Sequence, residues 1–237
     1  MNPAILGNDG TMNDLLESAG TVLDDVVALR RHVHAEPELG LDNPRTQALV
    51  LEALDGLPLE VRTGNGLTSV VADLVGATDG PTVLLRADTD ALPMTEDTGL
   101  DFRSTIDGRA HACGHDAHTA MLVGAAKVLA ARRHEFPGRV RFMFQPGEEG
   151  FAGARLMIAE GVLDGVDRAF ALHITPNQRV GTASCRPGPL LAGDTSITVT
   201  VRGRGGHASS PHHATDPIPA TAAIITALQT TVTREVD

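Results

Sequence analysis

The segments PTVLLRAD (residues 81–88) and RVRFMF (residues 139–144) decide the fold. Each is a short apolar run of the kind that forms a buried strand. Between them, the segment from Asp116 to about Arg133 is rich in Ala, Leu, Met and Val, which favours a helix. A helix that lies between two buried strands indicates a right-handed crossover between parallel neighbours. The sequence therefore predicts the α/β class, with a mainly parallel sheet flanked by helices.

The chain on either side continues this alternation. Apolar residues recur every three or four positions from Asn13 to His34, which predicts an amphipathic helix that ends before Pro37. A second helix is expected to follow, with Asn43 as its N-cap and Pro44 in its first turn. The other predicted elements are strands at residues 67–76 and 167–174 and a short helix at residues 154–161.

A change of composition predicts a domain boundary near residue 191, within the linker-like PGPLLAG at residues 187–193. Residues 12–190 would form the first domain. Beyond the boundary, TSITVTVRG (195–203) alternates as a half-exposed strand does, and IPATAAIITALQTTVTRE (218–235) favours a helix. One strand and one helix cannot bury a core alone. Residues 191–237 are therefore expected to be the incomplete start of a second domain.

The composition limits the class of partner. The chain has 19 basic and 30 acidic side chains, a formal charge of −11, which repels polyanions. We therefore expect a small-molecule substrate, with no nucleic acid and no membrane as partner. The N-terminal stretch lacks a positively charged start and a sustained apolar run, so no signal peptide is predicted. With only two cysteines and no sign of a disulfide scaffold, we expect a cytoplasmic protein.

Reactive side chains gather where the predicted strands end. In open α/β sheets, ligands bind beyond the carboxyl ends of the strands, so side chains delivered there are candidates for a site. The segment HACGHDAH (111–118) precedes the central helix and reaches the same edge. Four separate segments therefore converge. Their candidate residues are, in chain order, Asp88, Asp90, Cys113, His115, Asp116, Glu148, Glu149 and His173.

This set of donors favours a divalent metal. A thiolate, imidazoles and carboxylates together suit zinc, nickel, cobalt or manganese, whereas calcium and magnesium prefer oxygen donors alone. The neighbouring Glu148 and Glu149 suggest a division of work, in which one carboxylate holds the cation and the other takes a proton from water. A metal lowers the pKa of its bound water to about 7, which places that water within reach of a carboxylate base.

Each residue also has an ordinary interpretation. Cys113 and His115 taken singly are more often buried residues than ligands, and acidic residues near Pro or Gly are common in solvated loops. These interpretations weaken together, because unpaired charges are costly to bury and here several gather at one edge. A second hypothesis pairs the Cys113 thiol, as nucleophile, with a nearby histidine. That mechanism leaves the two glutamates without a role. The histidines available to it are His111, His115 and His118.

Six ordered motifs resemble a known family. RRHVHAEPELG, LLRADTDALPM, GRAHACGHDAHTAML, FQPGEEG, ALHI and GRGGHASSPHHATDP are similar to the motifs of the aminoacylase and carboxypeptidase metallopeptidases, peptidase family M20. The nearest branch contains hippurate hydrolases, indole-acetyl-amino-acid hydrolases and other N-acyl-amino-acid amidohydrolases. The resemblance implies a zinc-peptidase-like catalytic domain at residues 12–190, followed by the start of a ferredoxin-like lid and dimerisation domain.

The resemblance also implies roles for particular residues. It implies metal-dependent hydrolysis of N-acyl amino acids by a homodimer with two divalent ions (Zn, Mn, Co or Ni). Glu148 would be the general base, Asp90 would orient a ligand, and His207 would polarise the scissile carbonyl, usually from a partner subunit. The implied metal ligands are Cys113, His115, Glu149 and His173.

The chain departs from the family pattern at its end. Members continue beyond this point, complete the lid and supply a last histidine ligand, so the resemblance implies a chain that is truncated at its C-terminus. Two alternatives therefore stay open: an inactive fragment that only binds metal, and a dipeptidase or carboxypeptidase of the same family. Thr89 stands where Met is usual, which we expect to matter little. The roles of Asp88, His34 and His212 are left open.

Overall fold

The structure is a computed structural model, and it describes residues 10–191 and 197–235. The chain divides into two compact units, Met1–Ala183 and Ser184–Asp237, which are described separately. The domain roles predicted for residues 12–190 and 191–237 stay predictions. None of the helices that the structure describes has the length and apolarity that crossing a membrane requires.

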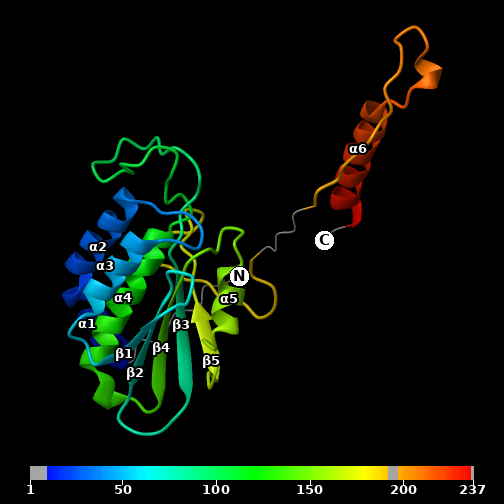
Figure 1. Cartoon of the computed structure of the whole chain (residues 1–237). Coiled ribbons are helices and arrows are strands. Elements are labelled where there is room, and N and C mark those ends of the chain that lie inside the picture. The colour runs from blue at the N-terminus through cyan, green and yellow to red at the C-terminus, as the bar shows by residue number, and fades with distance from the viewer. Residues whose placement is uncertain (1–9, 192–196, 236–237) are drawn as a thin grey trace. The chain divides into compact units, whose positions relative to one another are not determined.

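The first unit is built on a five-stranded sheet with the order β1-β2-β4-β3-β5 (Figure 1). β3 is parallel to both β4 and β5, whereas β2 is antiparallel to both β1 and β4. The α/β class is confirmed, but the sheet is mixed rather than mainly parallel. β2 follows β1 as a hairpin and so runs antiparallel to both of its neighbours. The strands are β1 (Leu59–Thr63), β2 (Val70–Val75), β3 (Thr82–Asp88), β4 (Arg139–Gln145) and β5 (Arg168–Ala171).

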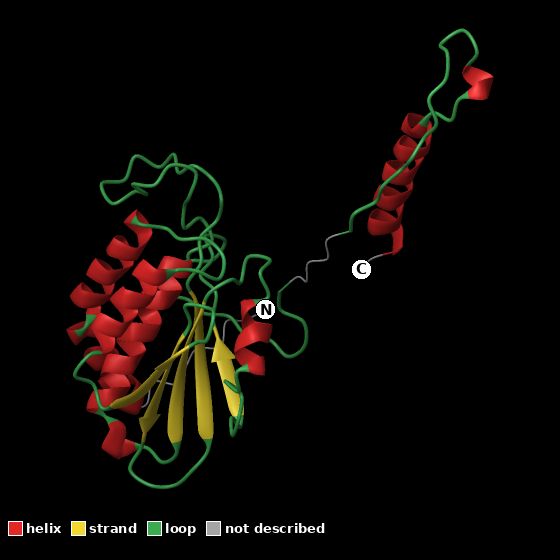
Figure 2. Ribbon diagram, in the orientation of Figure 1, coloured by secondary structure: helices red, strands yellow, loops and turns green. Residues whose placement is uncertain are grey.

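Helices cover both faces of this sheet. α1–α4 lie on one face and the short α5 lies on the other (Figure 2). The single helix predicted from Asn13 to His34 is wrong, because the chain breaks at Val22 into α1 and α2. Gly20, Thr21 and Val22 all have weak helix propensity, which explains the break. The helices are α1 (Gly10–Thr21), α2 (Leu23–Ala35), α3 (Pro44–Leu54), α4 (His115–Ala131) and α5 (Gly153–Ala159), with a 3₁₀ turn at Arg133–Glu135.

The core is divided by the alternation of side chains along β4. Phe142 and Phe144 are buried with residues of α3 and α4, and Met143 is buried on the other face with Met157 and Val162. Successive residues of a strand point to opposite faces, so this one strand fills both layers. The larger layer holds α4 against the sheet, and α4 is the helix that begins at the candidate site.

A buried carboxylate caps α3. Asn43 is at the N-cap position, but its side chain makes no capping bond. Instead, the Glu38 carboxylate accepts hydrogen bonds from the backbone N–H groups of Arg45 at 3.2 Å and Thr46 at 2.9 Å. The Asn43 side-chain oxygen accepts a 3.0 Å bond from the Thr89 hydroxyl. Thr89 therefore ties the loop after β3 to the start of α3, a contact that methionine at this position would not make.

A buried ion pair joins the two central antiparallel strands. Asp73 on β2 accepts two bonds from the Arg141 guanidinium on β4, Nε to Oδ1 at 2.8 Å and Nη2 to Oδ2 at 3.0 Å. Arg141 also donates to the carbonyl groups of Val162 and Asp164 beyond α5. Burial acts to raise the pKa of Asp73, but Arg141 and two further arginines hold that pKa below its usual value.

The second unit contains one long helix, α6 (Pro217–Glu235), as predicted for residues 218–235. A 3₁₀ turn at Pro211–His213 and an isolated bridge between Arg204 and Thr215 precede it. The predicted strand at 195–203 is wrong for residues 197–203, which have no regular structure in the part of the unit that is described. A strand needs a neighbour for its hydrogen bonds, and none of the described residues forms a strand paired with this segment. Residues 195 and 196 lie outside the described residues.

Asp73→Asn is expected to lower the free energy of unfolding by about 3 kcal/mol at pH 7, because it leaves the Arg141 charge buried without its counter-ion. The lowered native pKa makes this stabilisation complete above the unfolded value of about 3.9, and it is lost as the pH falls through the native pKa. Urea unfolding at pH 7 and at a pH below the native pKa of Asp73 checks both points. The exposed Asp97→Asn is the control, and an equal loss at both pH values would contradict the assignment.

Candidate metal centre

The predicted site residues of the first unit gather at one edge of the sheet. β3 ends at Asp88, β4 ends just before Glu148 and Glu149, and β5 ends two residues before His173. α4 begins at His115, directly after Cys113 and Gly114. Because β3, β4 and β5 are mutually parallel, their carboxyl ends meet at this edge, as the sequence predicts.

His115 presents an unpaired nitrogen to this edge. Its side chain is 1% exposed, and Nδ1 lies 2.7 Å from the Asp90 carbonyl oxygen. A carbonyl only accepts, so Nδ1 carries a proton, and in the neutral imidazole Nε2 carries the lone pair. Among the described residues, Nε2 has no hydrogen-bond partner. A buried acceptor of this kind, surrounded by acidic residues, fits a bound cation.

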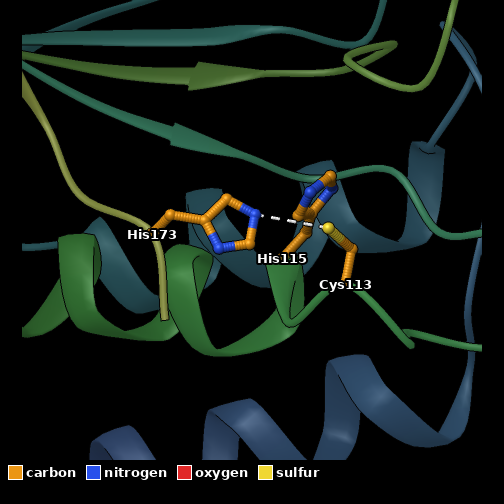
Figure 3. A group of neighbouring side chains, drawn as sticks. All are labelled: Cys113, His115 and His173. Atoms are coloured by element: carbon orange, nitrogen blue, oxygen red, sulfur yellow. Dashed lines mark hydrogen bonds between the residues drawn. The ribbon is translucent and has the colours of Figure 1, made fainter. Parts of the chain in front are cut away.

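Two further donors lie beside His115, as Figure 3 shows. The Cys113 sulfur is 3.3 Å from Nε2 of His173, and candidate ligand atoms of all three residues lie within 4.8 Å of one another. Nδ1 of His173 lies 2.6 Å from the Ile174 carbonyl oxygen, to which it donates, so the lone pair on Nε2 faces Cys113. Two imidazole lone pairs and one thiol therefore converge.

The paired glutamates also lie close to His115. Candidate ligand atoms of His115, Glu148 and Glu149 also lie within 4.8 Å of one another. The Asp90 carboxylate accepts bonds from the backbone N–H groups of Glu148 at 2.9 Å and Glu149 at 3.0 Å. Asp90 thus fixes the glutamate loop with its side chain and His115 with its carbonyl. The orienting role predicted for Asp90 stays a prediction.

The electrostatics favour a positive ion at this point. Burial, and then Glu149, Asp88 and Glu148, raise the pKa of the Cys113 thiol to about 12. Burial and the Glu149 charge also raise the pKa of Glu148. Burial opposes protonation of His115, but Asp90 and Asp88 outweigh it and raise the pKa of His115. All three shifts favour protonation, which is the response of a site with excess negative charge.

Asp88, whose role the sequence leaves open, is hydrogen-bonded to two other side chains. It is buried, with Oδ1 2.6 Å from Nδ1 of His118 and Oδ2 2.7 Å from Nη1 of Arg86. Burial acts to raise the pKa of Asp88, but His118, His115 and Arg86 lower it to about 2. Asp88, His115 and His118 also form a third group with the spacing of metal ligands. Both carboxylate oxygens of Asp88 thus accept hydrogen bonds from protein side chains.

A second histidine and carboxylate network lies behind the site, and sequence reasoning missed it. Nδ1 of His34 is 2.7 Å from the Asp116 carboxylate and Nε2 is 3.1 Å from Glu96, while Arg30 pairs with Asp116 at 2.7 Å. The Asp116 bond leads the effects that raise the pKa of His34. The motif RRHVHAEPELG contains both cationic partners, and it was the available signal. The network fixes α2 and the loop around Glu96 to the start of α4.

The family resemblance also predicts a role for His207, a histidine of the second unit. His207 lies there, with Nδ1 2.8 Å from the Ser209 hydroxyl. Its predicted contact with the scissile carbonyl stays a prediction. His212 is exposed beside His213, with ring centroids 4.1 Å apart.

Comparisons with known proteins agree on one family. The model of peptidase family M20/M25/M40 matches residues 84–236. N-acetyl-L-cysteine deacetylase from Bacillus subtilis is 42% identical over 92% of this chain and 52% of its own length. Thermostable carboxypeptidase 1 from Saccharolobus solfataricus is 42% identical over 95% of this chain and 57% of its own length. The chain therefore spans about half the length of these relatives.

A solved structure gives the same result. The crystal structure of a Bacillus subtilis protein, described as a dinuclear metal binding peptidase from the M20 family, matches with a TM-score of 0.68 and 43% identity. The match covers 70% of this chain and 47% of that one.

The raised pKa of Cys113 predicts slow alkylation of this thiol in metal-free protein, because the thiolate is the reactive form. Cys185→Ser leaves Cys113 as the only thiol, and Cys113→Ser leaves the exposed Cys185 as the matched reference. Iodoacetamide labelling near pH 8, followed by mass spectrometry, should modify Cys185 first. Faster labelling of Cys113 would favour the thiol nucleophile over the metal centre.

Proposed function

Because the chain belongs to peptidase family M20/M25/M40, we propose that it carries the metal centre of an amidohydrolase acting on N-acyl amino acids. The observation that carries the proposal is the buried Nε2 of His115, which has no hydrogen-bond partner among the described residues. His115 is shared by two groups of candidate ligands, one with Cys113 and His173 and the other with Glu148 and Glu149. The activity belongs to the whole protein, since this chain spans about half of each curated relative described above.

The donors suit two divalent ions such as zinc, manganese, cobalt or nickel. Cys113, His115, Glu149 and His173 are the proposed ligands, because their donor atoms lie within the two groups that share His115. A thiol and two imidazoles exclude a calcium or magnesium preference. When bound, such ions lower the pKa of water and polarise carbonyl oxygens. The excess negative charge of the site would be offset by their charge.

Glu148 is the proposed general base. One of its carboxylate oxygens lies 3.9 Å from Nε2 of His115, and its side chain is 43% exposed, so water reaches it. Its raised pKa brings it nearer to the value that suits proton transfer at neutral pH. Glu148 would take the proton of the attacking water and deliver it to the leaving amine. Asp90 holds the backbone of this loop in place, and His207 would polarise the scissile carbonyl from a partner subunit.

The relatives support a small acylated substrate. One is named a deacetylase of N-acetyl-L-cysteine, which is an N-acyl amino acid. Another is named a carboxypeptidase, which supports the alternative of a carboxypeptidase or dipeptidase. A hippurate-like substrate, a homodimer and a cytoplasmic location stay predictions.

Glu148→Gln is expected to lower turnover by about 100- to 10,000-fold, because the amide cannot accept the proton of water. Metal content should stay at the wild-type level, since the proposed ligand is Glu149. Ninhydrin detection of released amine and elemental analysis measure the two quantities. The exposed Glu52→Gln on α3 is the matched control. Undiminished turnover in the Glu148 variant would remove Glu148 from the mechanism.

Substrate class and metal dependence are tested together. Chelator-stripped protein should regain hydrolysis of N-acetyl amino acids or hippurate when cobalt or manganese is added, and it should hydrolyse dipeptides more slowly. Faster dipeptide cleavage would favour the peptidase alternative. Metal binding without turnover of either class would favour a chain that only binds metal, and hydrolysis unaffected by chelators would exclude the metal mechanism.

A further inference from the structure

The segment that carries His173 is exposed, and its backbone forms few hydrogen bonds to other elements. β5 ends at Ala171, and residues 172–175 are exposed. In the part of the chain that the structure describes, one hydrogen bond joins the backbone of residues 173–175 to another element. It runs from the Ile174 N–H to Nε2 of His118 on α4, at 3.0 Å.

His118 is held rigidly enough to act as an anchor. It is 3% exposed, and its Nδ1 lies 2.6 Å from Oδ1 of Asp88. The Ile174 N–H only donates, so Nε2 of His118 carries the lone pair and Nδ1–H donates to Asp88. Asp88 is held in turn by Arg86, whose Nε bonds the Gln145 side chain at 2.8 Å. The chain of contacts therefore runs from the ends of β3 and β4 to the backbone beside His173.

We propose that His118 is a positioning residue, which, held by Asp88, fixes the backbone at Ile174 and so sets His173 beside Cys113. The inference rests on the proposed function, in which His173 is a metal ligand. The His118 and His173 rings meet edge to face, with centroids 4.7 Å apart. Both ring nitrogens of His118 are used by hydrogen bonds, so His118 is not itself a ligand, despite its spacing to Asp88 and His115.

Gly114 supports the same arrangement. Its φ is +87°, and a Cβ built there would collide with Cδ1 of Ile174. The Ile174 side chain therefore packs directly on the backbone between Cys113 and His115. The backbone N–H of Ile174 and its side chain are thus both held by the start of α4, one by His118 and the other by Gly114.

Three substitutions separate the two hydrogen bonds of His118. His118→Asn places an amide near the position of Nδ1 and keeps the bond to Asp88 alone. His118→Gln places its amide near Nε2 and keeps an acceptor for Ile174 alone. His118→Phe keeps a ring but removes both bonds. His32→Asn, at an exposed position of α2, is the matched control, and circular dichroism establishes that each variant folds.

Two measurements are made on the 237-residue chain. The first is the affinity of chelator-stripped protein for Co²⁺, followed by the thiolate-to-cobalt absorption. The second is hydrogen exchange of the Ile174 amide in metal-free protein, which reports the anchor directly. We expect His118→Asn and His118→Phe to lose about 10- to 100-fold in cobalt affinity and to exchange faster at Ile174. His118→Gln should stay nearer to wild type in both cobalt affinity and Ile174 exchange. His32→Asn should match the wild-type protein in both measurements.

The outcomes are distinguishable. Wild-type cobalt affinity in His118→Asn and His118→Phe would overturn the inference and leave the proposed function standing. Lower affinity with unchanged Ile174 exchange would identify His118 as a direct ligand and would also overturn it. If wild-type protein itself bound no cobalt, the proposed metal centre would fail and the inference with it. Should His118→Phe not fold, the Asn and Gln pair decides the question.

Discussion

The lone pair on Nε2 of His115 is the constraint on which the rest of the site depends. In the neutral imidazole, a buried acceptor without a partner costs about 1–3 kcal/mol, and the bond from Nδ1 to the Asp90 carbonyl holds the ring in this orientation. The same pocket raises the pKa of the Cys113 thiol to about 12. A divalent cation would bind the Nε2 lone pair of His115 and stabilise the Cys113 thiolate. An apolar or neutral group would do neither. The folded chain therefore holds in place an arrangement that a bound cation would stabilise.

Buried carboxylates hold this arrangement together by bonding distant segments. Asp90 bonds the glutamate loop, Asp88 bonds α4 through His118, and Asp116 bonds α2 through His34. Glu38 does the same for the start of α3. Each carboxylate accepts from donors that would otherwise be unpaired, so its burial is compensated locally. Acidic residues of this chain therefore stabilise contacts in its interior as well as lying on its surface.

The sequence predicted the helices and strands better than the hydrogen bonds that join them. The apolar runs of β3 and β4 and the helix between them were recognisable, so the edge where Cys113, His115 and the glutamates gather was predicted. β1 was missed because it is an exposed edge strand without an apolar run. The roles of Asp88 and His118 depend on which ring nitrogen faces which oxygen, and spacing along a chain carries no information about that. The cap of α3 by Glu38, rather than Asn43, is a similar case.

The bonds that build the site join residues far apart in the chain, and this has a consequence for folding. Asp88 and His118 are separated by 30 residues, Cys113 and His173 by 60, and His34 and Asp116 by 82. Closing such long loops costs entropy before any contact repays it. Helix α4 forms from local contacts, but the edge it serves is complete only when β5 has paired with β3. The donors of the proposed metal centre are therefore assembled only through contacts between segments that are distant in the chain, and such contacts form more slowly than the local contacts of a helix.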